Sequence, residues 1–158
     1  VLPYFSGERT PIHDPKARGT IFGLDLTHNR GDIFRAFLEG IAMGTAQVFE
    51  TYEAIGQKPK KVMAVGGGTK NNIWMQATSD FSQIDQVISE KSTGASYGNA
   101  FLAALAVGAV SQRDITKWNP ELSKIKTQHS ALHAEKNKLF RQLYERSKEI
   151  AHAVADST

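Results

Sequence analysis

The longest regular pattern in the chain is a helical repeat of apolar residues between positions 32 and 56. Asp32 is a favoured N-cap residue and Gly56 ends the repeat. The recurring positions are Phe34, Phe37 or Leu38, Ile41, Thr45, Val48, Tyr52 and Ile55. The pattern predicts one long helix. Because Gly40 and Gly44 weaken its middle, we expect a closely packed partner there.

A strand, a turn, a helix and a second strand follow within residues 62–89. Val62–Val65 is an apolar run that predicts a buried strand, and Gln86–Ser89 predicts another. Between them, Asn71 or Asn72 can cap a helix with an inner face of Trp74, Ala77, Phe81 and Ile84. A unit of this length predicts two parallel strands and a right-handed crossover.

The next segment is apolar on nearly every side. Glu90–Ala95 is a second glycine-containing loop, and it leads into a helix from Ser96 to about Val107 that contains FLAALAV. A helix without a polar face is expected to be buried. If the two strands are neighbours, the loops that follow them should be neighbours too.

The remaining segments are less regular. Residues 1–31 show no sustained period, so we expect an ordered loop region with one short strand near Thr20–Leu24. Residues 109–130 read as a polar connector held in place by the Trp118 ring. Residues 131–155 predict a final helix with the apolar stripe Leu132, Leu139, Phe140, Leu143, Tyr144, Ile150, Ala151 and Val154.

Composition narrows the classes of protein. The chain has 158 residues, 41% apolar and 22% charged, which is typical of one globular domain or part of one. It has no cysteine, which excludes disulfides and thiolate metal sites and suits the cytoplasm. The net charge of +3 permits an anionic ligand, but basic and acidic residues alternate, so we predict no nucleic-acid partner. No apolar run is long enough to predict a membrane span. The opening Val-Leu-Pro, which has no initiator Met, is interpreted as a cut within a domain.

The candidate chemistry lies in the turn after the first strand. Gly66, Gly67 and Gly68 remove every Cβ there, so a ligand could touch bare backbone beside a helix N-terminus that favours negative charge. The turn matches neither common phosphate motif, because Lys70 follows Thr69 and Asn71 stands where a dinucleotide fingerprint has glycine. The alternative is a tight turn without a ligand.

Three other polar features each have two interpretations. Glu39 beside the apolar stripe is an acid–base candidate, but a paired structural carboxylate is favoured. The rigid Gly7–Pro11 loop could grip a polyol or phosphate, or Glu8 and Arg9 could pair with each other. His129 and His133 lie four residues apart, but Ser130 stands where the zinc-protease motif has glutamate, so no metal site is predicted.

Five stretches, in this order, resemble the C-terminal domain of the FGGY carbohydrate kinases, most closely the xylulose kinase-like branch. They are LPYFSGERTP, DPKARGTIFGLDLTH, FLEGIA, VGGGTKNNIWMQATSD and TGASYGNAFLAALAVG. The resemblance covers about residues 2–110. The family's second signature is matched by Gly19, Ile21, Gly23, Leu24, Asp32, Ile33, Ala36, Leu38 and Glu39, with a bulkier Phe37 than the family pattern favours.

The resemblance implies an α/β fold, part of an actin-like ATPase (ribonuclease H-like) domain with a βαβ core and long helices that lacks its N-terminal strands. It implies phosphoryl transfer from ATP, with Mg²⁺, to a hydroxyl of a small sugar or polyol, with D-xylulose the first choice. The nucleotide-binding role passes to Gly66, Gly67, Gly68, Thr69 and Asn71. No catalytic or metal-binding residue is carried over, because the family's catalytic aspartate lies in its first domain.

The same resemblance implies partners. Residues 1–158 would be a partial C-terminal domain, with a loop region (1–31), a core (32–110) and a C-terminal helix (131–155), inactive without the missing N-terminal domain. Exposed apolar edges favour association with that domain or with a second copy. Two alternatives are a non-enzymatic actin-like nucleotide-binding or scaffold module whose basic last helix docks a partner, and a βαβ domain with no ligand.

Overall fold

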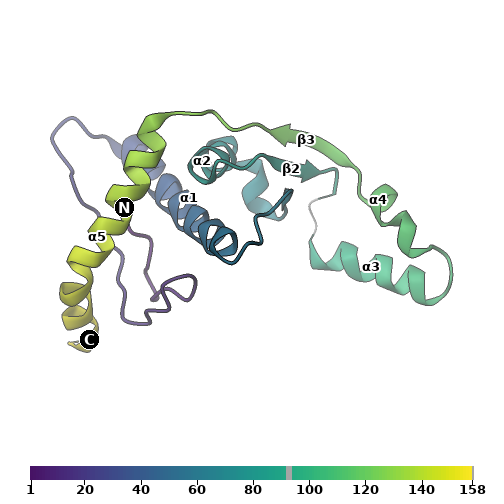
Figure 1. The fold of residues 1–158 in the computed structure, drawn as a ribbon, viewed down its shortest axis with the longest axis horizontal. Coiled ribbons are helices and arrows are strands. Elements are labelled where there is room, and N and C mark those ends of the chain that lie inside the picture. The colour runs from purple at the N-terminus through teal and green to yellow at the C-terminus, as the bar shows by residue number, and fades with distance from the viewer. Residues whose placement is uncertain (92–93, 158) are drawn as a thin grey trace.

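The structure, a computed structural model, describes residues 1–91 and 94–157 (Figure 1). Its helices are α1 Arg30–Ala54, α2 Asn72–Ser82, α3 Ala95–Ala106, α4 Ile115–Trp118 and α5 Ala131–Asp156. Its strands are β1 Val62–Ala64, β2 Gln86–Ser89 and β3 Glu121–Ile125, and its short 3₁₀ turns are η1 Gly67–Lys70 and η2 Gln112–Asp114. The predicted α/β class with a βαβ core is confirmed.

The three strands form one sheet in the order β1–β2–β3. The β1 and β2 strands are parallel, as predicted, and Met63 lies opposite Val87. The third strand is antiparallel to β2, with Lys124 opposite Val87. The segment 109–130, predicted as a polar connector, therefore also contributes the strand β3, which was not predicted. Its residues are mostly exposed and show no apolar alternation, so the sequence pattern does not reveal the strand.

The first helix begins earlier than predicted because Asn29, not Asp32, is its N-cap. The Asn29 Oδ1 accepts the Gly31 N–H at 2.7 Å, and Asp32 Oδ2 accepts the Asn29 N–H at 2.9 Å. Asp32 is thus the reciprocal member of a capping box. A Cβ on Gly40 would lie 2.6 Å from the Val1 carbonyl oxygen, so the expected close partner exists there. No such partner lies at Gly44, because a Cβ there would meet no atom within 4 Å in the described residues.

The core lies where α1, α2, α5 and the N-terminal loop meet. Tyr4 from the loop contacts Phe140 and Tyr144 of α5 edge-on, with ring centroids 6.0 and 5.8 Å apart. The core cluster consists of Leu2, Tyr4, Ala17, Ala42, Met43, Ala46, Ala77, Phe81, Phe140 and Tyr144. The N-terminal loop is therefore anchored by Leu2, Tyr4 and Ala17, whereas Phe5, Phe22 and Leu24 stay more than half exposed.

The short strand predicted at Thr20–Leu24 is wrong for the described residues. Thr20 pairs with Leu2 in an isolated antiparallel bridge, and no ladder continues from it. Phe22 is 76% exposed, and Gly23 has a φ of +81°, a conformation that departs from an extended strand.

The prediction that the apolar helix after β2 is buried is also wrong. The third helix extends away from the body, far from α5 (Figure 1), and of its residues only Phe101 is buried. Trp118 of α4 holds it, with its ring centroid 5.5 Å from Tyr97 and 5.4 Å from Phe101. Its other apolar sides find no cover in the described part of the chain. The loop Glu90–Ala95 includes Ser92 and Thr93, which lie outside the described residues.

Candidate nucleotide site

The candidate site is the turn that carries the chain from β1 into α2. Gly66 has a φ of +93°, which turns the backbone where a Cβ would be strained. The next four residues form η1, in which the Gly66 carbonyl accepts the Thr69 N–H at 3.2 Å and the Gly68 carbonyl accepts the Asn71 N–H at 3.0 Å. The turn is thus internally bonded and has a defined shape.

Each of the three glycines has a different relation to its surroundings. Gly66 is required by its positive φ. Gly68 is required by packing, because a Cβ there would lie 2.8 Å from the Trp74 ring. The φ of Gly67 lies outside the left-handed region, so its backbone does not require glycine. A Cβ there would meet no atom within 4 Å. The fold of the described chain therefore accounts for two of the glycines and leaves the space over Gly67 open.

Thr69 and Asn71 use their side chains to build the turn. The Thr69 hydroxyl donates to the Gly66 carbonyl at 2.8 Å. Asn71, one of the two predicted caps, is the N-cap of α2, and its Oδ1 accepts the Trp74 N–H at 3.0 Å. The cap fixes the carboxamide beside the turn with its acceptor occupied, so its NH₂ group is the part suited to a ligand.

A groove of about 510 Å³ lies between β1 and the α3–α4 pair, and none of the turn residues Gly66–Asn71 lines it. Val65, which precedes Gly66, and Gly94, which precedes α3, both line it. The loops after the two parallel strands therefore approach each other at these residues. Met63 and Val65 are 47% and 59% exposed, so the prediction that they are buried is wrong. An apolar run alone does not distinguish an edge strand from a central one.

Glu39 is held in ion pairs between helices. Its carboxylate accepts the Arg35 guanidinium and the Lys136 ammonium, each at 2.9 Å, and its side chain is 14% exposed. Burial alone would raise the Glu39 pKa, but hydrogen bonds from Lys136 and Arg35 outweigh burial and lower it. The interpretation of Glu39 as a paired structural carboxylate is confirmed.

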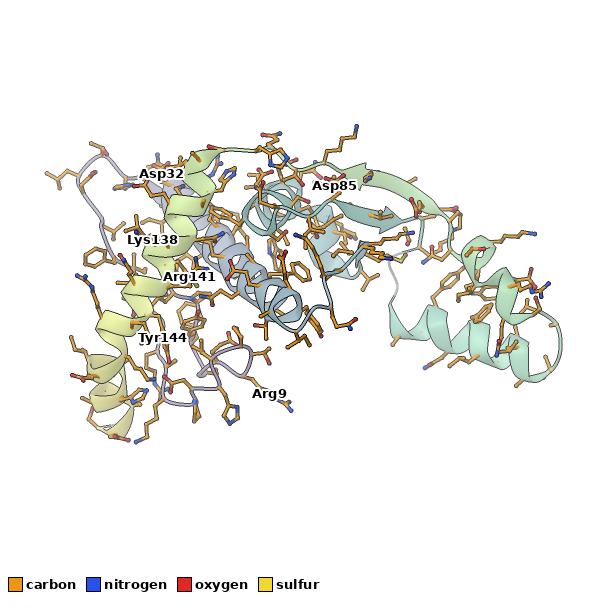
Figure 2. The ribbon with its side chains drawn as sticks, viewed as in Figure 1. Arg9, Asp32, Asp85, Lys138, Arg141 and Tyr144 are labelled. Carbon is orange, nitrogen blue, oxygen red and sulfur yellow. The ribbon has the colours of Figure 1, made fainter. Side chains whose placement is uncertain are left out.

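The Gly7–Pro11 loop is closed by backbone bonds between Glu8 and Asp14, at 2.9 and 2.7 Å. Glu8 Oε1 accepts the N–H groups of Arg9 and Thr10, and no ion pair between Glu8 and Arg9 is found within the described residues. Arg9 points away from the body (Figure 2). A role of this loop in gripping a polyol or phosphate stays a prediction.

Residues 1–91 and 94–157 contain no group of three or more His, Asp or Glu side chains placed to hold a metal ion. His129 contacts Gln83 and His133 packs on the Phe81 ring, with centroids 5.0 Å apart. None of the helices in the described part of the chain has the length and apolar character needed to cross a membrane.

Comparison with known proteins identifies relatives over most of the chain. Residues 1–107 match the model of the C-terminal domain of the FGGY family of carbohydrate kinases. The xylulose kinase of Escherichia coli K12 is 33% identical over 153 residues, which cover 91% of this chain and 31% of that protein. Gluconokinases and glycerol kinases are also among the similar proteins.

Solved structures agree. The crystal structure of xylulose kinase from Rhodospirillum rubrum matches with a TM-score of 0.81 and 30% identity, over 96% of this chain and 31% of the other. Plasmodium falciparum glycerol kinase with ADP matches with a TM-score of 0.75 and 27% identity, over 95% and 30%. The chain spans about a third of the length of these proteins. Because the family model covers more than half of its residues, the chain belongs to the FGGY family of carbohydrate kinases and matches its C-terminal domain.

Proposed function

We propose that this chain supplies the nucleotide-binding half of a longer, cytoplasmic, ATP-dependent sugar kinase. The parent would transfer a phosphoryl group from ATP to a hydroxyl of a small sugar or polyol, with D-xylulose as the first choice. Similarity to proteins named xylulose kinase supports that choice. Relatives named glycerol kinase and gluconokinase make glycerol and gluconate the alternatives to be screened.

The observation that carries the proposal is the open space over Gly67. Gly66 and Gly68 are explained by backbone conformation and by Trp74, but nothing in the described chain fills the position of a Gly67 Cβ. Contact of a flat ligand or phosphate with the bare backbone would explain why glycine stands at this position. We therefore assign Gly66, Gly67, Gly68, Thr69 and Asn71 to the wall of a nucleotide pocket, with Gly67 in closest contact.

The residues of this chain do not by themselves provide the full chemistry. When bound, ATP supplies the phosphoryl group, and Mg²⁺ neutralises charge on its phosphates. Mg²⁺ usually takes one or two carboxylates plus phosphate oxygens and waters. No cluster of acidic side chains in the described residues fits that role. We infer that the carboxylates for the metal and the catalytic base come from the N-terminal domain of the parent.

Calorimetric titration of the full-length parent with ATP tests the pocket. Gly67→Ala should weaken ATP binding at least tenfold, because its Cβ occupies the ligand's place. Gly44→Ala is the matched control, since its Cβ also meets no atom within 4 Å but lies in α1. Equal ATP affinity in Gly67→Ala and the unchanged parent would reject the pocket.

Asn71 requires a substitution that keeps the helix cap. Asn71→Ala would remove the cap and cost about 1 kcal/mol of stability, which would mix folding with binding. Asn71→Asp keeps an acceptor for the Trp74 N–H but replaces the NH₂ donor with an oxygen. Weaker ATP binding with an unchanged melting temperature is the expected result.

The chain alone should neither phosphorylate a sugar nor bind ATP tightly, because it forms one side of the cleft. A coupled assay for ADP release, with xylulose, glycerol and gluconate in turn, checks this on the chain and on the parent. Sugar-dependent ADP release by the pure chain would contradict the proposal.

The contacts of α5 give little support to the alternative that this chain is a scaffold module. Two of its basic residues are used inside the chain, Lys136 on Glu39 and Arg141 on Glu50. The exposed apolar residues of α3, such as Leu102 at 60%, instead favour cover by the rest of the parent or by a second copy. Light scattering of the parent would separate a monomer from a homo-oligomer.

A further inference from the structure

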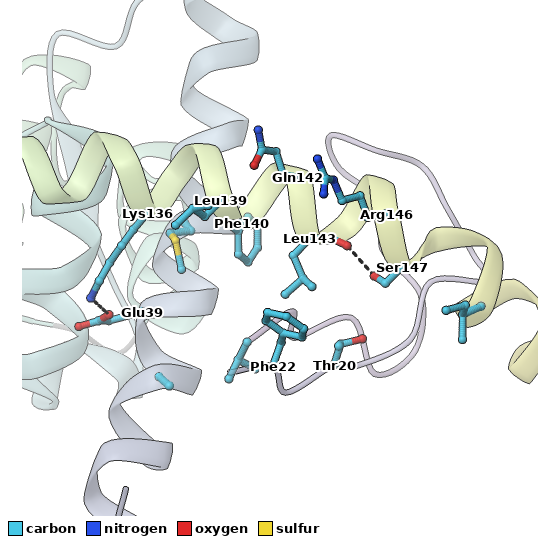
Figure 3. A pocket seen from close by; sticks show the side chains of 14 residues that line it. Thr20, Phe22, Glu39, Lys136, Leu139, Phe140, Gln142, Leu143, Arg146 and Ser147 are labelled. Atoms are coloured by element: carbon cyan, nitrogen blue, oxygen red, sulfur yellow. Dashed lines mark hydrogen bonds and ion pairs between the residues drawn. The ribbon is translucent and has the colours of Figure 1, made fainter. Parts of the chain in front are cut away.

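A hollow of about 460 Å³ lies over the N-terminal loop, and the proposed function gives it no role. Most of its lining residues carry polar side chains, and they are Ser6, Gly7, Glu8, Arg9, His13 and Pro15. The candidate nucleotide turn contributes none of them. A larger groove of about 680 Å³ between α1 and α5 is lined mainly by apolar side chains, so it suits a charged ligand less well (Figure 3).

The backbone beneath the hollow is fixed at several points. Glu8 and Asp14 exchange two backbone hydrogen bonds, at 2.9 and 2.7 Å. Asp14 is 5% exposed, and its carboxylate accepts the Tyr144 hydroxyl of α5 at 2.8 Å. Gly7 has a φ of +78°, and a Cβ on it would lie 2.7 Å from the Pro15 carbonyl oxygen. Packing and hydrogen bonding thus account for Gly7, Glu8 and Asp14.

Arg9 and His13 are not explained in this way. The His13 N–H donates to the Arg9 carbonyl at 3.1 Å, which places the two residues one turn apart beside the same hollow. His13 has a φ of +46°, a conformation that is uncommon outside glycine. Neither side chain has a hydrogen-bond or ion-pair partner within residues 1–91 and 94–157, and Arg9 points away from the body (Figure 2). The fold therefore positions these two side chains without using them.

The other two basic residues near this loop are already used inside the chain. Lys16 pairs with Asp156 at 2.6 Å. Arg18 Nη1 donates to two backbone carbonyls of the loop, at 3.2 and 2.9 Å. Among the lysines and arginines of this loop region, Arg9 is therefore the residue that stays available to a ligand.

The side-chain groups left over are mainly hydrogen-bond donors. Glu8 Oε1 accepts the N–H groups of Arg9 and Thr10, so this acceptor is occupied within the loop. The Arg9 guanidinium can donate two parallel hydrogen bonds to an oxyanion, and His13 and the Ser6 hydroxyl can each donate one more. Because the backbone is fixed in advance, little of the loop has to be ordered when a ligand binds.

We propose that residues 6–13 form a binding site for a phosphate group, in which Arg9 donates the main hydrogen bonds and His13 and Ser6 orient the ligand. Phosphorylated sugars and nucleotides both carry this group. The inference does not rest on the glycine turn, because the hollow and the turn share no residue.

Titration of the full-length parent with inorganic phosphate at constant pH, followed by NMR of labelled histidine, tests the site. The ring signal of His13, identified by its absence in His13→Gln, should shift and saturate. We expect saturation in the millimolar range, because the charge of Glu8 opposes an anion. Sodium chloride at the same ionic strength should not move the signal. A signal that ignores phosphate, or that follows chloride equally, would overturn the proposal.

A matched pair of substitutions tests the role of Arg9. Arg9→Gln should raise the dissociation constant for phosphate at least fivefold and leave the melting temperature unchanged, because Arg9 has no partner in the described chain. Arg113→Gln is the control, since Arg113 is also exposed and without a side-chain partner among the described residues, but lies in η2 outside the hollow. Equal phosphate affinity in Arg9→Gln and the unchanged parent would contradict the site, whatever Gly67→Ala does to ATP binding.

Two phosphate esters then separate the sources of the group. If a pentulose phosphate shifts the His13 signal at a lower concentration than inorganic phosphate does, and Arg9→Gln weakens this effect, the site receives a phosphorylated sugar. The same result with ADP assigns the site to a nucleotide. If neither ester binds more tightly than inorganic phosphate, the assignment to a phosphorylated ligand is wrong.

Discussion

The Tyr144 hydroxyl donates a hydrogen bond of 2.8 Å to the Asp14 carboxylate and thereby joins α5 to the N-terminal loop. His152 Nε2 lies 2.7 Å from the same carboxylate, and the Lys16 N–H donates to it at 3.0 Å. Asp14 is only 5% exposed. One buried carboxylate therefore organises two segments separated by 130 residues.

The first prediction concerns acid stability. Burial alone would raise the Asp14 pKa, but hydrogen bonds from His152, Tyr144 and Lys16 outweigh burial and lower it from 3.8 to about 2. Because the pKa is lower in the folded chain, the stabilisation is present above pH 4 and is lost as the pH falls toward 2. It should amount to on the order of 2 kcal/mol.

Urea unfolding between pH 2 and pH 7 measures this contribution. Asp14→Asn should be less stable than the unchanged chain at pH 7, and the difference should shrink at pH 2. Tyr144→Phe removes one of the donors and should show a smaller effect of the same sign. A difference that does not depend on pH would contradict the assignment.

The second prediction separates the two neighbouring glycines of the turn. Gly68→Ala places a Cβ 2.8 Å from the Trp74 ring and should cost about 1–3 kcal/mol through overpacking. Gly67→Ala meets no atom and should change stability by less than about 0.5 kcal/mol. Adding Trp74→Leu to Gly68→Ala should recover part of the loss in a double-mutant cycle. Equal costs at the two glycines would show that the packing is wrong.

The third prediction concerns the ion pairs of Glu39. Lys136 is 39% exposed and links α5 to α1, whereas Arg35 is 68% exposed and lies one turn away on α1. We expect a coupling energy of about 1 kcal/mol between Glu39 and Lys136, and less between Glu39 and Arg35. Urea unfolding of the single and double alanine variants gives both values. In the parent, Glu39→Gln should leave phosphoryl transfer within about threefold, because the Glu39 carboxylate is held in ion pairs with Arg35 and Lys136.

The helices and the parallel strand pair follow from local pattern, because apolar spacing and caps act within a few residues. The start of α2 illustrates this, since the place of Asn71 and Asn72 before a helical stripe predicts a cap at one of them. Asn29 shows the limit. Both Asn29 and Asp32 are good caps three residues apart, and only their reciprocal bonds decide which one begins the helix.

Burial and pairing over long distances could not be predicted. The apolar faces of α3 predict a buried helix, but burial depends on what lies beside it. The Glu121–Ile125 strand has little apolar pattern and pairs only because β2 presents an open edge. In the candidate site, the glycines were identifiable from sequence. Only the fold shows that the Trp74 ring requires glycine at position 68, whereas Gly67 faces open space.

The placement of the two tryptophans, the only ones in the chain, gives it two built-in optical reporters. Trp74 touches Gly68 in the candidate nucleotide turn, and Trp118 rests on Tyr97 and Phe101 of the outlying helix. With one of them replaced by phenylalanine, the fluorescence of the other follows a single region. Once any tryptophans outside this chain are also replaced, the proposed arrival of nucleotide at the turn and coverage of α3 could be timed separately in the parent, without any attached dye.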